Sequence, residues 1–146
     1  MKSVKTEPPG RKTVQELIGK ALCAASLAYA PYSRFQVGAA LLCADGSVCT
    51  GCNVENASYP AGLCAERAAV AKAVGGGKRE FAAIAIVGGK DGKVTDFCPP
   101  CGICRQVLRE FANPERFYVI LAASADRYRL FTLEELFPES FGPEKL

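Results

Sequence analysis

The sequence predicts an α/β protein folded as a three-layer α/β/α sandwich around a five-stranded mixed sheet. Two observations carry this prediction. Segments with helical periodicity alternate along the chain with short apolar runs, and some of these runs are apolar on both faces, as in strands that helices cover on both sides. The length of 146 residues and the 49% of hydrophobic residues suit one domain with one core. We therefore expect a flexible N-terminal arm over residues 1–12 and a single domain over residues 13–146.

The first half of the chain is predicted to hold one helix and a hairpin. From Thr13 as N-cap, apolar side chains recur every three or four residues, and Pro31 cannot continue that helix. Strands are then expected over residues 36–44 and 47–53. The Asp45-Gly46 dipeptide between them predicts a two-residue hairpin turn.

The second half of the chain alternates helix and strand. We expect these elements at residues 64–74 (helix), 81–87 (buried central strand), 100–111 (helix), 117–122 (strand) and 128–131 (strand). Three glycines from Gly75 end the first of these helices, Gly88 follows the central strand, and Pro100 suits the first turn of the next helix. Thr132-Leu133-Glu134-Glu135 matches a capping box and predicts a short C-terminal helix.

Composition excludes several classes of function. The chain has no histidine, so Ser-His-Asp and Cys-His catalysis and His-ligated zinc proteases are impossible. The net charge of +3 is small and scattered, so we expect no nucleic-acid partner. No apolar run reaches the roughly 18 residues of a membrane helix, and no signal peptide is recognisable. We expect a cytoplasmic protein with reduced thiols and no membrane partner.

Three of the eight cysteines form a candidate metal site. Cys101 and Cys104 lie three residues apart on a predicted helix, and Cys64 begins another, so the positive helix N-termini would stabilise their thiolates. Three thiolates around Zn2+ leave one position open for water, as in catalytic zinc sites. Arg67 would offset the net negative charge by donating hydrogen bonds to sulfur. Glu66 lies close enough to exchange a proton with the bound water.

Other interpretations of the cysteines stay open. Cys101 and Cys104 alone could be a redox pair or half of a structural site. Cys98 could complete a closed four-thiolate structural zinc site, although Pro99 and Pro100 should take it off the helical face of the other two thiols. The remaining cysteines are predicted to pack in the core: Cys23, Cys43, Cys49 and Cys52.

The combined motifs closely resemble the small-subunit cytidine deaminases. The matching segments are Phe35-Gln36-Val37-Gly38-Ala39-Ala40, Asn53-Val54-Glu55-Asn56, Cys64-Ala65-Glu66-Arg67 and Pro100-Cys101-Gly102-Ile103-Cys104-Arg105-Gln106-Val107. In the H-x-E then P-C-x-x-C pattern of base deaminases, Cys64 stands in the histidine position. The resemblance extends from about Val14 to Pro143, although Ser124-Ala125-Asp126 lacks the usual turn glycine.

The resemblance implies a cytidine deaminase-like fold and a zinc-dependent enzyme of pyrimidine salvage. It would deaminate cytidine and deoxycytidine hydrolytically to uridine and deoxyuridine, with release of ammonia. Cys64, Cys101 and Cys104 would bind one zinc ion per subunit. Zinc-bound hydroxide would attack C4 while Glu66 shuttles protons to N3 and to the departing amino group.

The resemblance also implies substrate contacts and an assembly. Asn53 and Glu55 would bind the ribose hydroxyls, the Ala65 backbone N–H would meet the base carbonyl, and Phe35 and Tyr59 would lie beside the base and the 5′ end of the sugar. Relatives of this type are homotetramers with shared active sites. Phe141 would accordingly stack on the base bound by an adjacent subunit.

Three alternatives remain at this point. The first is a deaminase of a related nucleoside such as blasticidin S, against which Asn53 and Glu55 argue. The second is a polynucleotide deaminase, which would need a basic groove with interleaved aromatic residues. The third is a non-catalytic four-thiolate zinc module that uses Cys98.

Overall fold

A computed structural model describes residues 7–146 and confirms the three-layer fold. Its elements in chain order are α1 (Arg11–Ala25), β1 (Phe35–Cys43), β2 (Val48–Cys52), η1 (Tyr59–Ala61), α2 (Ala65–Gly75), β3 (Phe81–Lys90), α3 (Gly102–Phe111), β4 (Tyr118–Ala122), β5 (Tyr128–Thr132), α4 (Leu133–Leu136) and η2 (Pro143–Lys145). The two single-turn 3-10 helices, η1 and η2, carry no apolar periodicity from which they could be predicted.

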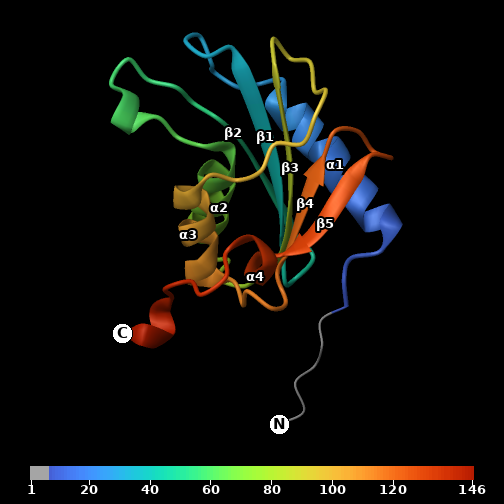
Figure 1. Cartoon of the computed structure of the whole chain (residues 1–146), viewed down its shortest axis with the longest axis vertical. Helices are drawn as coiled ribbons and strands as arrows, with labels where there is room; N and C mark the ends of the chain where they lie inside the picture. Colours follow the sequence, from blue (N-terminus) through green and yellow to red (C-terminus); the bar gives the residue numbers. More distant parts are fainter. Residues whose placement is uncertain (1–6) are drawn as a thin grey trace.

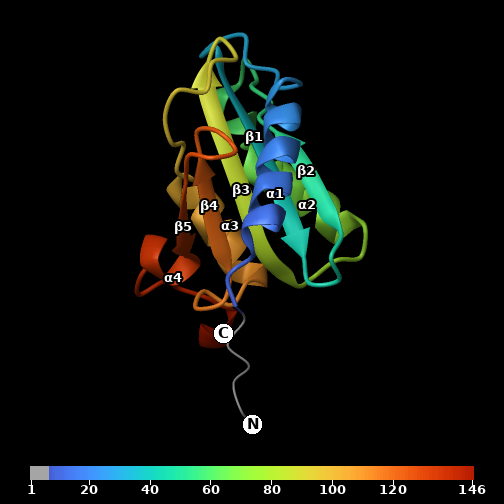
Figure 2. The ribbon, with the colours of Figure 1, turned by 90° about the vertical axis from the view of Figure 1, so that its right-hand side faces the viewer.

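The five strands form one mixed sheet in the order β2-β1-β3-β4-β5. Strands β3 and β4 pair in parallel, and the other neighbours are antiparallel. Helix α1 covers one face of the sheet, and α2 and α3 lie together on the other (Figure 1). Figure 2 shows α1 in front of the sheet and the α2–α3 layer behind it. Each face has its own apolar core, so β3 is the buried central strand that its sequence predicts.

The predicted helix boundaries need three corrections. Helix α1 begins at Arg11 with Gly10 as N-cap, two residues before the predicted domain start at Thr13. Residues 1–6 of the predicted arm lie outside the described part of the chain. Helix α1 ends at Ala25, with Ser26 as its C-cap, well before Pro31. Helix α3 begins only at Gly102, so Pro100 precedes it.

The end of β3 and the turn between β1 and β2 also differ from the prediction, and other strand ends shift by one residue. Strand β3 continues through Gly88 to Lys90. Gly88 does not end the strand; it allows close packing of Cys98, since a Cβ at this position would lie 2.8 Å from the Cys98 Sγ. The β1–β2 turn has three residues, since the Cys43 N–H donates to the Ser47 carbonyl at 2.8 Å. Gly46 takes the left-handed conformation in it, with φ of 89°. The short C-terminal helix is confirmed, with the Thr132 side chain accepting from the Glu135 N–H.

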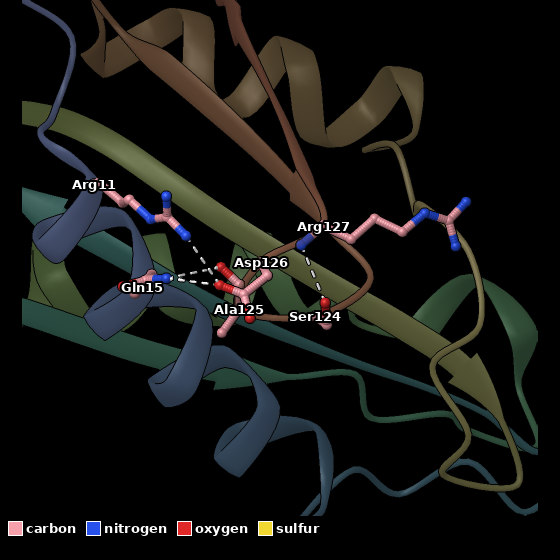
Figure 3. Close-up of polar contacts among 6 residues, drawn as sticks. All are labelled: Arg11, Gln15, Ser124, Ala125, Asp126 and Arg127. Atoms are coloured by element: carbon pink, nitrogen blue, oxygen red, sulfur yellow. Dashed lines mark hydrogen bonds and ion pairs between the residues drawn. The ribbon is translucent and has the colours of Figure 1, made fainter.

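The β4–β5 turn closes without a glycine and is attached to α1 (Figure 3). The Ser124 hydroxyl accepts from the Arg127 N–H at 3.1 Å inside the turn. From the first turns of α1, Arg11 and Gln15 donate to the Asp126 carboxylate at 3.2 and 3.1 Å. Side-chain hydrogen bonds thus stabilise this turn, which contains no glycine.

The four cysteines predicted for the core differ in burial. Cys43 is buried, and Cys49 and Cys52 are half-buried in the hairpin. Cys23 is exposed, which corrects the prediction, because it lies outside the apolar stripe of α1. Among residues 7–146 no helix has the length and apolar character required to cross a membrane.

Candidate active site

The three cysteines singled out by their spacing lie together in the structure. The Cys101 Sγ is 3.9 Å from the Cys64 Sγ and 3.5 Å from the Cys104 Sγ, and all three sulfurs lie within 4.8 Å of one another. Tetrahedral zinc with Zn–S bonds of about 2.3 Å separates its sulfur ligands by about 3.8 Å. The sulfur positions therefore fit Zn2+.

Two helix N-termini position these thiols. Cys64 is the N-cap of α2 and Cys101 the N-cap of α3, while Cys104 lies in the first turn of α3. Burial opposes ionisation of Cys101, but hydrogen bonds from the backbone and side chain of Cys104 and from the Cys64 thiol hold the pKa of Cys101 below its ordinary value. Burial raises the pKa of the Cys104 thiol. A cation between the sulfurs would favour the thiolate form of all three.

Arg67 lies beside the thiol cluster, as its position in the sequence predicts. Its Nη2 is 3.6 Å from the Cys64 Sγ and donates to the Gly62 carbonyl at 3.3 Å. Its Nε is buried and has no hydrogen-bond partner among the described residues. The positive guanidinium is thus available to balance thiolate charge.

Glu66 is a buried carboxylic acid next to the cluster. Its side chain is only 4% exposed, and it lies in the first turn of α2. Burial raises the pKa of Glu66 above its ordinary value, and this exceeds the opposing effects of the Cys104 thiol and Arg67. A raised pKa suits a group that must both accept and release a proton near neutral pH.

A cavity of about 400 Å3 opens onto Glu66 and onto the thiols of Cys64 and Cys101. Four predicted substrate-binding residues line it: Asn53, Glu55, Tyr59 and Ala65. No sequence pattern predicts a role for the apolar part of its wall, which is formed by Val37, Val54, Leu63 and Pro99. Only the pairing of β1 with β2 and the path of the loop before α3 bring these residues to one place.

Cys98 lines the same cavity but stands outside the thiol cluster. The group of side chains able to hold a metal contains Cys64, Cys101 and Cys104 without it. Burial raises the pKa of Cys98 to about 11, with smaller contributions from Glu66 and Cys64, so its thiol is neutral. This geometry opposes a closed four-thiolate site.

Backbone and side-chain contacts hold the two predicted ribose-binding residues in place. The Asn53 side chain accepts from the Val37 N–H and donates to the Phe35 carbonyl, both at 2.8 Å. The Glu55 carboxylate accepts from the Tyr32 and Ser33 N–H groups at 2.9 and 3.1 Å and from the Ser33 hydroxyl at 2.5 Å. The sequence analysis missed Ser33, because its link to Glu55 crosses 22 positions of the chain.

Two predicted aromatic contacts lie outside the cavity lining. Phe35 is 39% exposed, and its ring lies near Gly88, as does the Cys98 thiol. Phe141 is 57% exposed on the C-terminal segment and does not line the cavity of its own chain.

The fold and site define a class of protein: α/β/α proteins with three clustered thiols that fit Zn2+ and a buried glutamate beside them. A family model described as the cytidine and deoxycytidylate deaminase zinc-binding region matches residues 11–121. The chain belongs to this zinc-binding deaminase family.

Curated relatives and solved structures agree with this assignment. A cytidine deaminase of Halalkalibacterium halodurans is 47% identical over 132 residues, which cover 90% of this chain and 96% of the relative. One of Sporosarcina psychrophila is 43% identical over 133 residues, covering 91% and 94%. The crystal structure of cytidine deaminase from Burkholderia pseudomallei matches with a TM-score of 0.78 and 45% identity, covering 86% of this chain and 97% of that one.

Proposed function

We propose that this chain converts cytidine and deoxycytidine to uridine and deoxyuridine by hydrolytic deamination, with release of ammonia, in pyrimidine salvage. The observation that carries the proposal is the buried Glu66 beside three clustered thiols at a cavity of nucleoside size. The names of the relatives support the same substrate.

In this proposal Cys64, Cys101 and Cys104 hold one Zn2+ per subunit, and Arg67 balances their charge. Bound zinc supplies a Lewis acid that acidifies a water molecule at neutral pH. Glu66 would take a proton from that water while the water oxygen adds to C4. Glu66 would then deliver this proton to N3. Glu66 would then take the remaining proton from the new C4 hydroxyl and transfer it to the amino nitrogen. The bond between C4 and that nitrogen would break, the C4 carbonyl would form, and ammonia would leave.

The cavity wall supports recognition of an unphosphorylated nucleoside. Asn53 and Glu55 offer an amide and a carboxylate to the ribose hydroxyls, and the Ala65 N–H suits the base carbonyl. Phe35 would pack beside the base and Tyr59 near the 5′ end. Among the cavity-lining residues Arg67 is the one cation, and its Nη2 already contacts the Cys64 sulfur and the Gly62 carbonyl.

We also infer a cytoplasmic homotetramer with shared active sites. Exposed aromatic and aliphatic side chains near the cavity mouth would be covered by neighbouring subunits: Tyr29, Tyr32, Val54 and Tyr59. Phe141 would reach the base bound by an adjacent subunit, since it does not line its own cavity. Thiolate ligands suit the reducing conditions of the cytoplasm.

The test is ultraviolet absorbance of cytidine during incubation with purified protein, with zinc measured on the same sample. We expect turnover and about one zinc per chain. Glu66→Gln should keep zinc and lower kcat by about 10²-fold to 10⁴-fold. A protein that contains zinc and deaminates blasticidin S but not cytidine would show that the proposed substrate is wrong. A protein that is active without zinc would overturn the mechanism.

A further inference from the structure

The C-terminal segment is fastened to α3 by a buried arginine. Arg109 is only 9% exposed, and its Nε donates to the Ser140 hydroxyl at 2.9 Å. Its Nη2 also donates to the Glu144 carboxylate, in an ion pair. Gly142 lies against the guanidinium so closely that a Cβ there would be 2.4 Å from the Arg109 Cζ. Arg109 thus contacts the chain on both sides of Phe141.

The backbone of Phe141 is held while its ring stays exposed. The Gln106 side chain donates to the Phe141 carbonyl at 3.0 Å. The Phe141 side chain nevertheless remains 57% exposed. A segment fastened only for stability would bury its large apolar ring, since burial of a phenylalanine is the larger gain. The arrangement instead holds the backbone of Phe141 and leaves its ring on the surface.

Helix α3 links this segment to the metal site. Arg105 donates from Nε to the Pro100 carbonyl at 2.8 Å, directly before Cys101, and from Nη1 to the Leu136 carbonyl. The helix that carries Cys104 therefore also sets the path of the chain near Phe141 (Figure 1, where the red C-terminal segment passes the lower end of α3). In a symmetric assembly, a thiol cluster at the start of α3 and a C-terminal segment bound to the same helix keep a constant relation between neighbouring sites.

We propose that Arg109 and Gln106 are positioning residues that aim the Phe141 ring at the nucleoside bound by a neighbouring subunit, with Gly142 required for the fit. The inference rests on the proposed function, in which Phe141 stacks on the base. We name the group of residues that would orient the ring the tail clasp. It consists of Arg109, Gln106, Ser140, Gly142 and Glu144.

The first test displaces the clasp without removing the ring. Gly142→Ala should raise KM for cytidine about tenfold and leave kcat unchanged, as expected for loss of a stacking contact made equally in ground and transition states. Arg109→Lys should act in the same direction, because lysine lacks the planar fork that reaches Ser140 and Glu144 together. Gly75→Ala, where an added Cβ meets nothing within 4 Å, is the matched control and should keep the wild-type KM.

A second test asks whether the ring acts on another subunit. Gly142→Ala chains keep a sound active site, and Glu66→Gln chains keep a sound tail clasp. In mixed oligomers made by co-expression, a Gly142→Ala active site can receive the Phe141 ring of a Glu66→Gln neighbour. Those sites should recover the low wild-type KM, whereas a purely structural defect in Gly142→Ala would leave the KM high. A mixture with the KM of Gly142→Ala alone would overturn the inference.

The two proposals fail in different ways. If wild-type protein does not deaminate cytidine, the proposed function fails. If wild-type protein is active but both Gly142→Ala and Arg109→Lys keep its KM, the tail clasp has no role in substrate binding and only this inference is lost. Light scattering that gives a monomer for active wild-type protein would also overturn it, since no neighbouring site would exist.

Discussion

At the residue scale, the polar groups of the cavity are fixed before substrate arrives. Asn53 is held by the β1 backbone and Glu55 by Ser33 and Tyr32, while Arg67 contacts sulfur and a carbonyl. Groups already oriented lose little entropy on binding, which favours the bound geometry that the reaction needs.

Removal of the Ser33 hydroxyl should weaken binding and change its pH dependence. Hydrogen bonds from Ser33 and Tyr32 lower the pKa of Glu55 below its ordinary value of 4.5, so its carboxylate stays charged to lower pH. In Ser33→Ala that pKa rises, and KM should begin to increase at a higher pH than in the wild type. At neutral pH we expect a KM about fivefold higher. Ser33→Thr retains the hydroxyl and should behave as the wild type in the same KM–pH profiles; unchanged profiles for Ser33→Ala would contradict this role.

Cys98 and Cys104 should respond differently to the same substitution. Cys98→Ser should keep about one zinc per chain and most of the activity, because its thiol stands outside the cluster. Cys104→Ser should lose zinc and activity together. Elemental analysis and cytidine turnover of both variants check this, and loss of zinc from Cys98→Ser would instead support a four-thiolate site.

At the element scale, the close approach of α2 to β2 places Cys64 and Glu66. A Cβ at Gly51 would lie 2.5 Å from the Ala65 carbonyl oxygen and from the Ala69 nitrogen, so the first turns of α2 rest directly on the β2 backbone. The absence of a side chain at Gly51 thus sets the distance between the sheet and α2, the helix that carries Glu66.

Gly51→Ala should therefore affect both stability and the site. The helix must shift, which lowers the free energy of unfolding by about 1–3 kcal/mol and reduces zinc occupancy. Urea denaturation and metal analysis measure the two effects. Gly75→Ala at the end of α2 meets nothing within 4 Å and should leave both near wild-type values. Normal zinc content in Gly51→Ala would show that α2 does not depend on this contact.

At the scale of the whole molecule, the thiol cluster joins parts of the chain that are far apart in sequence. Cys64 and Cys101 are 37 positions apart, and they cap the two helices of one layer. A metal bound by both would stabilise the packing of α2 against α3.

Chelation should consequently lower the melting temperature as well as abolish activity. A ligand that binds the native state stabilises it by RT ln(1 + [L]/Kd), so zinc removal from a site with free zinc at 100 times Kd costs about 2.7 kcal/mol. Calorimetry before and after chelation, and after zinc is restored, measures the change. An unaltered melting temperature in the verified zinc-free protein would separate the metal site from the stability of the fold.

The sequence by itself determined the fold class, the central strand β3 and the three thiols with Glu66. Helical and strand periodicity, helix-start signals and the spacing of Cys101 and Cys104 are local properties, and local backbone geometry translates them directly into structure. The elements that carry the three thiols could thus be located from short segments. The roles of Asn53, Glu55 and Phe141 came from resemblance.

Tertiary structure alone decided the contacts between distant segments. It separated Cys98 from the thiol cluster, paired Ser33 with Glu55, and extended β3 through Gly88 because the Cys98 loop packs there. It also placed Arg109 against the C-terminal segment. None of these contacts leaves a periodic signal, because each joins residues whose separation in sequence is unrelated to helix or strand geometry; only the packing of the layers brings them together.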